Sequence, residues 1–146
     1  MPQAPVLHDA SFAVLDGRQV HDLLALRSQV FVIEQACVYL DPDGRDTEPG
    51  ARHLWFEGEG RQVLACARIL DDGDARRIGR IATHPDHRGQ GLAGRLIERF
   101  LATTEGPWVM EAQAHLAGWY ARWGFERAGP DYIEDGIAHT PLHRKP

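Results

Sequence analysis

A glycine-rich turn between an apolar run and an amphipathic helix is the feature that most restricts how this chain can fold. The apolar run ends at His84-Pro85, and a residue before proline is pushed toward the extended geometry of a strand end. After Arg88-Gly89-Gln90-Gly91, apolar residues recur at helical spacing as far as Leu101. The pattern predicts a strand, a tight turn and a helix over residues 78–103.

This turn is suited to bind an anion. Backbone N–H groups at the start of a helix are free and lie at the positive end of the helix dipole. Gly89 and Gly91 can adopt positive φ and place no Cβ between a phosphate and the main chain, and Arg88 adds a positive charge. We therefore expect residues 88–94 to hold a pyrophosphate.

Residues 89–94 also spell the G-x-G-x-x-G pattern of dinucleotide-binding domains, and Glu111 falls near the position of the ribose carboxylate. Three observations argue against that interpretation. Residues 85–88 separate the glycines from the strand, and only about 50 residues follow the pattern. The preceding strands are joined by turns short enough for antiparallel hairpins, whereas a dinucleotide domain alternates strands with helices.

Two motifs point to another family. The turn, read as Arg88-x-x-Gly91-x-Ala93, resembles the coenzyme A loop of the GNAT acyltransferase superfamily, whose pattern is Gln/Arg-x-x-Gly-x-Gly/Ala. Farther along, Trp119-Tyr120 and Gly124-Phe125 resemble the second signature of that superfamily, a helix that carries tyrosine and ends at Gly-Phe. The segments that are similar to the ElaA-like branch are Arg27–Gln35, Asp43–Asp46, Arg52-His53, Ala67–Ile69, Gly79-Arg80, Gln113–His115 and Glu134–His139.

The rest of the chain is consistent with one α/β domain over residues 8–146, preceded by a loose tail at 1–7. Strands are expected at 11–15, 53–57, 63–70, 77–83 and 107–112, helices at 18–35, 92–103 and 116–123, and a last hairpin joining 125–127 to 138–143. Asp16 is placed to cap the first helix, and residues 36–51 form a long loop. The order β-α-β-β-β-α-β-α-β-β makes a mixed sheet, and the GNAT resemblance implies the same order with central strands splayed around the coenzyme.

Size and charge set further limits. The chain has 146 residues, of which 43% are apolar, enough for one domain with a core. Its net charge of −5, with no basic stretch beyond Arg144-Lys145, argues against nucleic acid and favours a cationic or neutral substrate. Without a secretory leader or a run of about 18 apolar residues, we expect a cytoplasmic protein with no membrane partner. Cys37 and Cys66 are expected to be reduced.

No metal site is expected. The run from Asp41 to Asp46 resembles a calcium loop, but its glycine stands fourth rather than sixth and no glutamate follows at the twelfth position. A solvated turn is the better interpretation. The eight histidines also show no pair at metal-ligand spacing.

The resemblance implies that acetyl-coenzyme A is the co-substrate, with its pantetheine arm paired to a strand edge. The residues assigned to it are Ile81, Ala82, Thr83, Arg88, Gly89, Gln90, Gly91, Leu92, Ala93, Gly94 and Gln113. Gln113 stands where the family often has asparagine. A backbone N–H near Ala82 could also stabilise the developing oxyanion.

Tyr120 is the candidate general acid, because the pKa of tyrosine, about 10, lies near that of the departing thiol. The alternative is a core position, since Leu116, Trp119, Tyr120 and Trp123 form one apolar stripe. The base is less defined: the candidates are Glu34, Glu111, His84 and His115, besides a water relay.

The acceptor side is assigned to Arg27, Phe31, Gln35 and Arg80, provided that the first helix borders the cleft. An arginine pair would suit a carboxylate on the acceptor, and Glu34 would suit its amine. Arg27 and Glu34 lie on the core-facing stripe, where the alternative is an internal ion pair.

These observations favour an N-acetyltransferase that moves an acetyl group from acetyl-coenzyme A to an amine of a small molecule or peptide. One alternative is a coenzyme A-binding module without turnover. Another is an enzyme like the acyl-homoserine-lactone synthases, which use acyl carrier protein and S-adenosylmethionine, although the complete Arg88-x-x-Gly91-x-Ala93 loop favours coenzyme A. The acceptor, the acyl length and the oligomeric state, a homodimer included, stay open.

Overall fold

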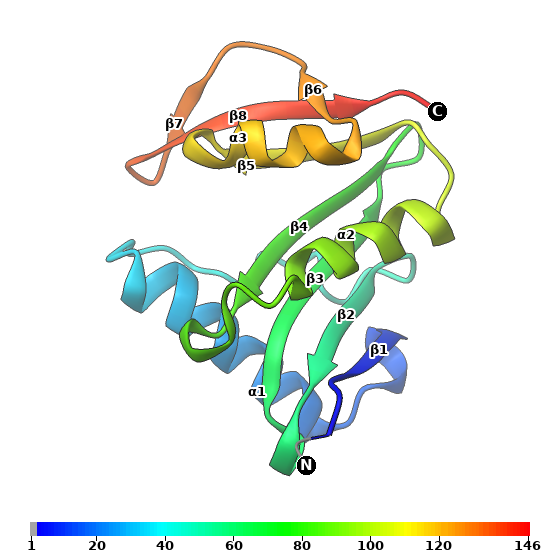
Figure 1. The fold of residues 1–146 in the computed structure, drawn as a ribbon, viewed down its shortest axis with the longest axis vertical. Coiled ribbons are helices and arrows are strands. Elements are labelled where there is room, and N and C mark those ends of the chain that lie inside the picture. Colours follow the sequence, from blue (N-terminus) through cyan, green and yellow to red (C-terminus); the bar gives the residue numbers. More distant parts are fainter. Residues whose placement is uncertain (1–2) are drawn as a thin grey trace.

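The computed structural model describes residues 3–146, which form one mixed sheet with helices packed on it (Figure 1). Four strands pair antiparallel in chain order: β1 (Val6–Ser11), β2 (Arg52–Glu57), β3 (Val63–Asp71) and β4 (Arg76–Thr83). The second half holds β5 (Trp108–Gln113), β6 (Glu126–Arg127), β7 (Tyr132–Glu134) and β8 (Ile137–Arg144). β8 pairs antiparallel with β5, β6 and β7. The mixed α/β sheet predicted from the sequence is confirmed.

The N-terminal strand begins earlier than expected. β1 starts at Val6, so residues 6 and 7 belong to a strand rather than a tail, while residues 1 and 2 lie outside the described part of the chain. Phe12–Val14 forms a 3₁₀ turn where a strand was predicted. Pairing with β2 determines where β1 begins and ends, because Val6 lies opposite Glu57 and Ser11 opposite Arg52. Strand preference depends on the neighbouring strand more than on local sequence.

The first helix has two differently wound parts. α1 (Gly17–Arg27) is capped as predicted: the Asp16 carboxylate accepts from the Gln19 N–H at 2.8 Å, and the Gln19 side chain accepts from the Asp16 N–H at 2.9 Å. The helix continues as a π-helix, η2 (Ser28–Glu34). π-Helical turns are uncommon and occur often at functional sites.

Two apolar clusters lie on opposite faces of the sheet. Successive residues of a strand point to opposite faces, and Phe56 and Trp55 of β2 belong to different clusters. α2 (Leu92–Thr103), found at the predicted bounds, covers the first face; its buried apolar side chains are Leu92, Leu96, Ile97 and Phe100. α1 covers the other face through Leu23 and Leu26, and η2 continues this cover through Val30. Helices on both faces explain why β2 and β3 are buried almost throughout.

β4 and β5 are parallel neighbours that separate soon after they meet. Only two residue pairs join them, Arg76 with Trp108 and Arg77 with Val109. Beyond this point the two halves of the sheet diverge, as Figure 1 shows for the ribbons of β4 and β5. The splayed central strands implied by the GNAT resemblance are therefore present.

The C-terminal part differs in detail from the predicted hairpin. α3 (Ala117–Tyr120) is short and is flanked by 3₁₀ turns at Ala114–Leu116 and Ala121–Trp123. β6 pairs with β8 as expected, but the turn at Asp135 and Gly136 joins β8 to the additional strand β7. Within residues 3–146, no helix is long and apolar enough to cross a membrane.

α2 packs closely against the 3₁₀ turn Ala121–Trp123 at one glycine, and this contact gives a stability prediction. A Cβ at Gly94 would lie 2.8 Å from the Trp123 ring, which itself packs against Trp119 at 4.6 Å between ring centroids. Gly94→Ala should therefore lower the free energy of unfolding by about 1–3 kcal/mol in a urea titration. Gly118→Ala is the matched control: a Cβ there has no neighbour within 4 Å, so the higher helix propensity of alanine should stabilise the protein slightly. Equal effects of both substitutions would contradict the close packing.

Candidate active site

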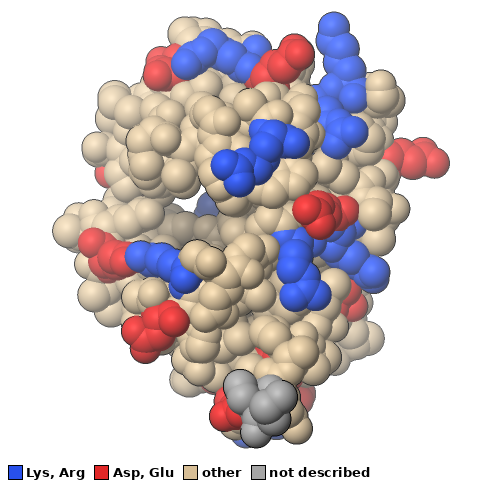
Figure 2. Space-filling model, in the orientation of Figure 1, with Lys and Arg blue, Asp and Glu red and all other residues tan. Residues whose placement is uncertain are grey.

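A cavity of about 1130 Å³ occupies the space where β4 and β5 separate. Its walls come from the end of η2, the loop after it, β4, the glycine turn, β5, α3 and the turn between β7 and β8. Figure 2 shows the molecule hollowed between the half that carries β5 and α3 and the half that carries α1. Residues from both ends of the chain therefore meet in one cleft.

The glycine turn has the geometry that its sequence predicts. Gly89 and Gly91 adopt φ of 78° and 77°, and Gly91 is the N-cap of α2. The turn from Arg88 to Gly91 is exposed, and nothing lies within 4 Å of a Cβ built on either glycine. The first hydrogen bond of α2 is donated by the Arg95 N–H to the Gly91 carbonyl, which leaves the N–H groups before it without helical partners.

The other predicted residues of this turn lie in different surroundings. Gly89, Arg88 and Ala93 line the cavity, whereas Gln90 and Gly91 are exposed outside it. Leu92 and Gly94 lie on the buried side of α2, so they can offer a ligand only main-chain groups.

Arg88 connects two walls of the cavity, the glycine turn and the end of η2. Its Nη1 lies 2.6 Å from Oε2 of Glu34 at the end of η2, and its Nε donates to the Thr83 carbonyl at 3.2 Å. The hydrogen bond from Arg88 holds the pKa of Glu34 below its ordinary value. Glu34 is thus an ionised, weakly basic partner of Arg88, which argues against it as the proton acceptor.

β4 carries a β-bulge beside the cavity. Cys66 pairs with Ala82 and Arg68 with Gly79, so the single residue between them on β3 faces two residues of β4. One of the two, Arg80, has a φ of 50°, a left-handed conformation that costs a non-glycine residue about 1–2 kcal/mol. The predicted coenzyme residues Ile81, Ala82 and Thr83 follow directly and line the cavity.

Tyr120 lies between the core and the cavity. The residue is 6% exposed, its ring belongs to the core cluster, and it meets the Trp119 ring edge-on at 5.0 Å. It also lines the cavity. Burial raises the pKa of its hydroxyl to about 12. The side chain therefore keeps its proton at neutral pH.

The remaining candidates for the base differ in access to the cavity. Glu111 lines it and accepts hydrogen bonds from the Tyr132 hydroxyl at 3.0 Å and from Arg77 Nη1 at 3.3 Å. His115 lines it as well. His84 does not; its Nδ1 accepts from the Asp86 N–H at 3.1 Å and caps the 3₁₀ turn Pro85–His87.

Arg27 does not reach the cavity, although the sequence assigned it to the acceptor side. It is 3% exposed, with Nε 2.6 Å from Oδ2 of Asp41 and Nη1 2.8 Å from Oδ1 of Asp46. The structure thus contains the internal ion pair that the sequence left as an alternative, with aspartates of the following loop as its partners. The other three residues assigned to the acceptor side, Phe31, Gln35 and Arg80, line the cavity, as does Gln113.

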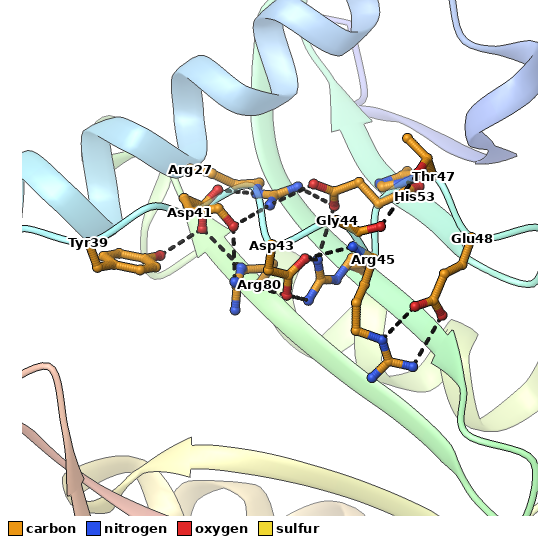
Figure 3. Close-up of polar contacts among 12 residues, drawn as sticks. Arg27, Tyr39, Asp41, Asp43, Gly44, Arg45, Thr47, Glu48, His53 and Arg80 are labelled. Atoms are coloured by element: carbon orange, nitrogen blue, oxygen red, sulfur yellow. Dashed lines mark hydrogen bonds and ion pairs between the residues drawn. The ribbon is translucent and has the colours of Figure 1, made fainter.

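The loop that was expected to be a solvated turn is instead bound to the sheet by ion pairs (Figure 3). Arg68 binds both carboxylate oxygens of Asp43, at 2.8 and 2.9 Å, and its Nη1 also lies 3.1 Å from Asp46. Burial alone would raise the pKa of Asp46, but Arg27 and Arg68 outweigh it and hold the pKa below its ordinary value. The aspartates are therefore charged partners of arginines, which corrects the prediction from the sequence.

Sequence reasoning missed several cavity residues. They are Cys37, Tyr39, Leu40, Asp43, Glu134, Asp135, Ile137 and His139. They come from the long loop and from the turn between β7 and β8, which meet where the Cys37 thiol donates to the Asp135 carbonyl at 3.3 Å. No spacing in the sequence indicates a contact over so many residues. In the part of the chain that the structure covers, no group of three His, Cys, Asp or Glu residues is placed to hold a metal ion.

Comparison with known proteins agrees with this geometry. The family model described as acetyltransferase (GNAT) domain matches residues 34–145. Protein ElaA of Escherichia coli is 36% identical over 147 residues, covering 94% of each chain, and a UPF0039 protein of Mycobacterium tuberculosis is 42% identical over 135 residues, covering 89% of this chain and 86% of the relative. The crystal structure of an acyl-CoA N-acyltransferase from Pseudomonas aeruginosa superposes with a TM-score of 0.90 at 35% identity, covering 97% of this chain and 99% of the other. The chain belongs to the GNAT acetyltransferase superfamily, in its ElaA-like branch.

Proposed function

We propose that this acyltransferase is an N-acetyltransferase that uses acetyl-coenzyme A and transfers the acetyl group to an amine of a small molecule or peptide. The observation that carries the proposal is the position of the glycine turn. The turn, with main-chain N–H groups that have no helical partner, borders a cavity that is also lined by the edge of β4 left unpaired by β5 and by Tyr120.

The residues at the turn fit a coenzyme. Its diphosphate would lie against the N–H groups at the start of α2, where both glycines leave open space and the helix dipole favours negative charge. Arg88 supplies the positive charge. The pantetheine arm, which carries two amides, would pair with the β4 edge at Ile81–Thr83, as an added strand pairs with a sheet.

The coenzyme supplies an activated thioester, and the protein supplies proton transfer and orientation. Tyr120 is assigned as the general acid, because it keeps its proton at neutral pH and lines the cavity. Glu111 is assigned to accept the proton of the amine, directly or through water, with His115 as the second candidate. A main-chain N–H near Ala82 would stabilise the developing negative charge on the thioester oxygen.

The acceptor site favours a positively charged amine. Arg80 already pairs with Asp41, so it is not a free partner for a carboxylate. The carboxylates of Glu111, Glu134 and Asp135 line the same cavity. The arginine pair that the sequence indicated for an acidic acceptor is therefore absent from the site, since Arg27 is buried elsewhere.

The proposal is tested by coenzyme binding. Gly89→Ala should weaken binding of acetyl-coenzyme A about tenfold in a calorimetric titration, because Gly89 lines the cavity, so the added Cβ would lie beside the expected phosphate, and because φ of 78° disfavours alanine. Gly73→Ala is the matched control. Gly73 has φ of 88° and open space around it, so the backbone cost is similar, but it lies in the turn between β3 and β4 and does not line the cavity.

Three results would contradict the proposal. Equal weakening by both substitutions would place the coenzyme elsewhere. Binding without release of thiol, over a panel of amino acids, polyamines and peptides, would favour the coenzyme-binding module. Tight binding of S-adenosylmethionine without binding of acetyl-coenzyme A would favour the lactone-synthase type.

A further inference from the structure

We propose that Asp41 is a positioning residue for acyl transfer. It holds the side chain of Arg80 so that β4 keeps its bulge, and the bulge sets the direction of the main-chain groups at residues 81–83 along the cavity. This inference rests on the proposed function and deepens it.

Arg80 occupies a conformation that its residue type disfavours. At this kind of bulge the residue with positive φ is usually glycine, because glycine has no Cβ to clash with the main chain. The position here carries a large side chain at φ of 50°. Something outside the backbone must therefore stabilise the bulge, and the side chain of Arg80 has ion-pair and hydrogen-bond partners that can do so.

Those partners come from the long loop. Nε of Arg80 lies 2.9 Å from Oδ1 of Asp41, and Nη2 donates to the Asp41 carbonyl at 3.0 Å and to Oδ2 of Asp43 at 3.3 Å. Figure 3 shows the Arg80 side chain leaving β4 toward Asp41, where its guanidinium meets both the carboxylate and the main-chain carbonyl. Two of the three contacts are to Asp41.

Asp41 is itself held from two other directions. Its side chain is 2% exposed, its Oδ2 accepts from Arg27 of α1 at 2.6 Å, and its Oδ1 accepts from the Tyr39 hydroxyl at 2.6 Å. A buried carboxylate with three partners has little freedom to move. Asp41 thus connects the bulge on β4 to the helix α1 and to Tyr39, which lines the cavity.

The bulge controls what the cavity offers to a thioester. The side-chain and main-chain directions of a strand alternate with a period of two residues, so loss or gain of one residue in the pairing reverses them. Ile81, Ala82 and Thr83 come directly after the extra residue. If Arg80 returned to ordinary strand geometry, the main-chain groups of residues 81–83 would reverse their directions relative to the cavity that these residues line.

Two substitutions at Arg80 separate this role from direct contact with a substrate. Arg80→Ala and Arg80→Gly lose the same contacts with Asp41, but only glycine accepts φ of 50° freely. We expect kcat for acetyl-coenzyme A to fall at least tenfold in Arg80→Ala, and to be at least fivefold higher in Arg80→Gly than in Arg80→Ala, with the same KM for the acceptor in both variants. Equal kcat in the two variants would overturn the inference.

The role of Asp41 is tested by one substitution made both in the wild-type chain and in the Arg80→Gly chain. Asp41→Asn should lower kcat about tenfold in the wild-type chain and less than twofold in the Arg80→Gly chain, where the bulge no longer depends on the side chain. Asp9→Asn is the matched control, because Asp9 pairs with Arg52 and Arg99 outside the cavity and its loss should leave kcat unchanged. An equal loss from Asp41→Asn in both backgrounds would show a purely structural role and overturn the inference.

Amide NMR spectra of the protein without coenzyme distinguish failure of this inference from failure of the proposed function. Arg80→Ala and Asp41→Asn should shift the amide signals of Ile81, Ala82 and Thr83, whereas Arg80→Gly should leave them near their wild-type positions. If the wild-type protein neither binds nor turns over acetyl-coenzyme A, the proposed function fails, and these shifts alone decide whether Asp41 holds the bulge. Absence of shifts in all three variants would overturn it.

Discussion

Tyr120→Phe should lower the rate of thiol release from acetyl-coenzyme A about 100-fold, because a positioned general acid contributes about 10²–10⁴-fold to a rate. The ring remains in the core cluster and only the hydroxyl is lost, so the fold and the affinity for the coenzyme should be unchanged. The measurement is kcat from a thiol-release assay, together with a calorimetric Kd for the coenzyme.

The pH profile gives an independent check on the same residue. With a pKa of about 12, Tyr120 stays protonated throughout the usual assay range, so it should cause no decline in kcat up to about pH 10. Unchanged kcat in Tyr120→Phe would exclude the tyrosine as the acid and leave it as a core residue.

Arg27→Met should cost the largest amount of stability of any substitution considered, about 3–5 kcal/mol in the free energy of unfolding. The methionine fills similar space, but it leaves the carboxylates of Asp41 and Asp46 buried without one of their cations. Urea titrations followed by tryptophan fluorescence measure the difference. Arg18→Met on the same helix is the control, because its pair with Asp22 is partly exposed and should contribute less than about 1 kcal/mol.

The sign of the pH dependence follows from Asp46. Its folded-state pKa lies below the unfolded value, so its ion pairs contribute stability above about pH 4, and this contribution is lost as the pH falls through the folded pKa. The difference between Arg27→Met and the wild type should therefore be largest near neutral pH and shrink below about pH 4. A difference under about 1 kcal/mol at pH 7 would mean that the buried network adds little to stability.

Local signals were enough to predict the parts of the fold that depend on neighbours in sequence. α2 has the predicted bounds because its start is set by Gly91 and its apolar stripe by the next turns of helix. The capping of α1 by Asp16 is equally local. Hairpin strands β2, β3 and β4 lie within a residue of their predicted ends for the same reason.

Contacts between distant segments could not be predicted in the same way. Asp41, Asp43 and Asp46 look like a polar turn in sequence, and their role depends on arginines from α1, β3 and β4 that only the fold brings together. The assignment of Arg27 to the acceptor side was wrong for this reason. The cavity residues of the turn between β7 and β8 were missed because their neighbours lie about a hundred residues earlier, as in the contact of Cys37 with Asp135.

The short pairing of β4 with β5 has a mechanical consequence. The two strands pair only at Arg76 and Arg77, and the next six residues of β4, as far as Thr83, pair with β3 alone over roughly 20 Å at the usual rise of a strand. A slight change of twist where the two strands pair therefore produces a larger change in their separation at the unpaired end. The width of the entrance can change to admit molecules of different size without breaking any pairing within either half of the sheet.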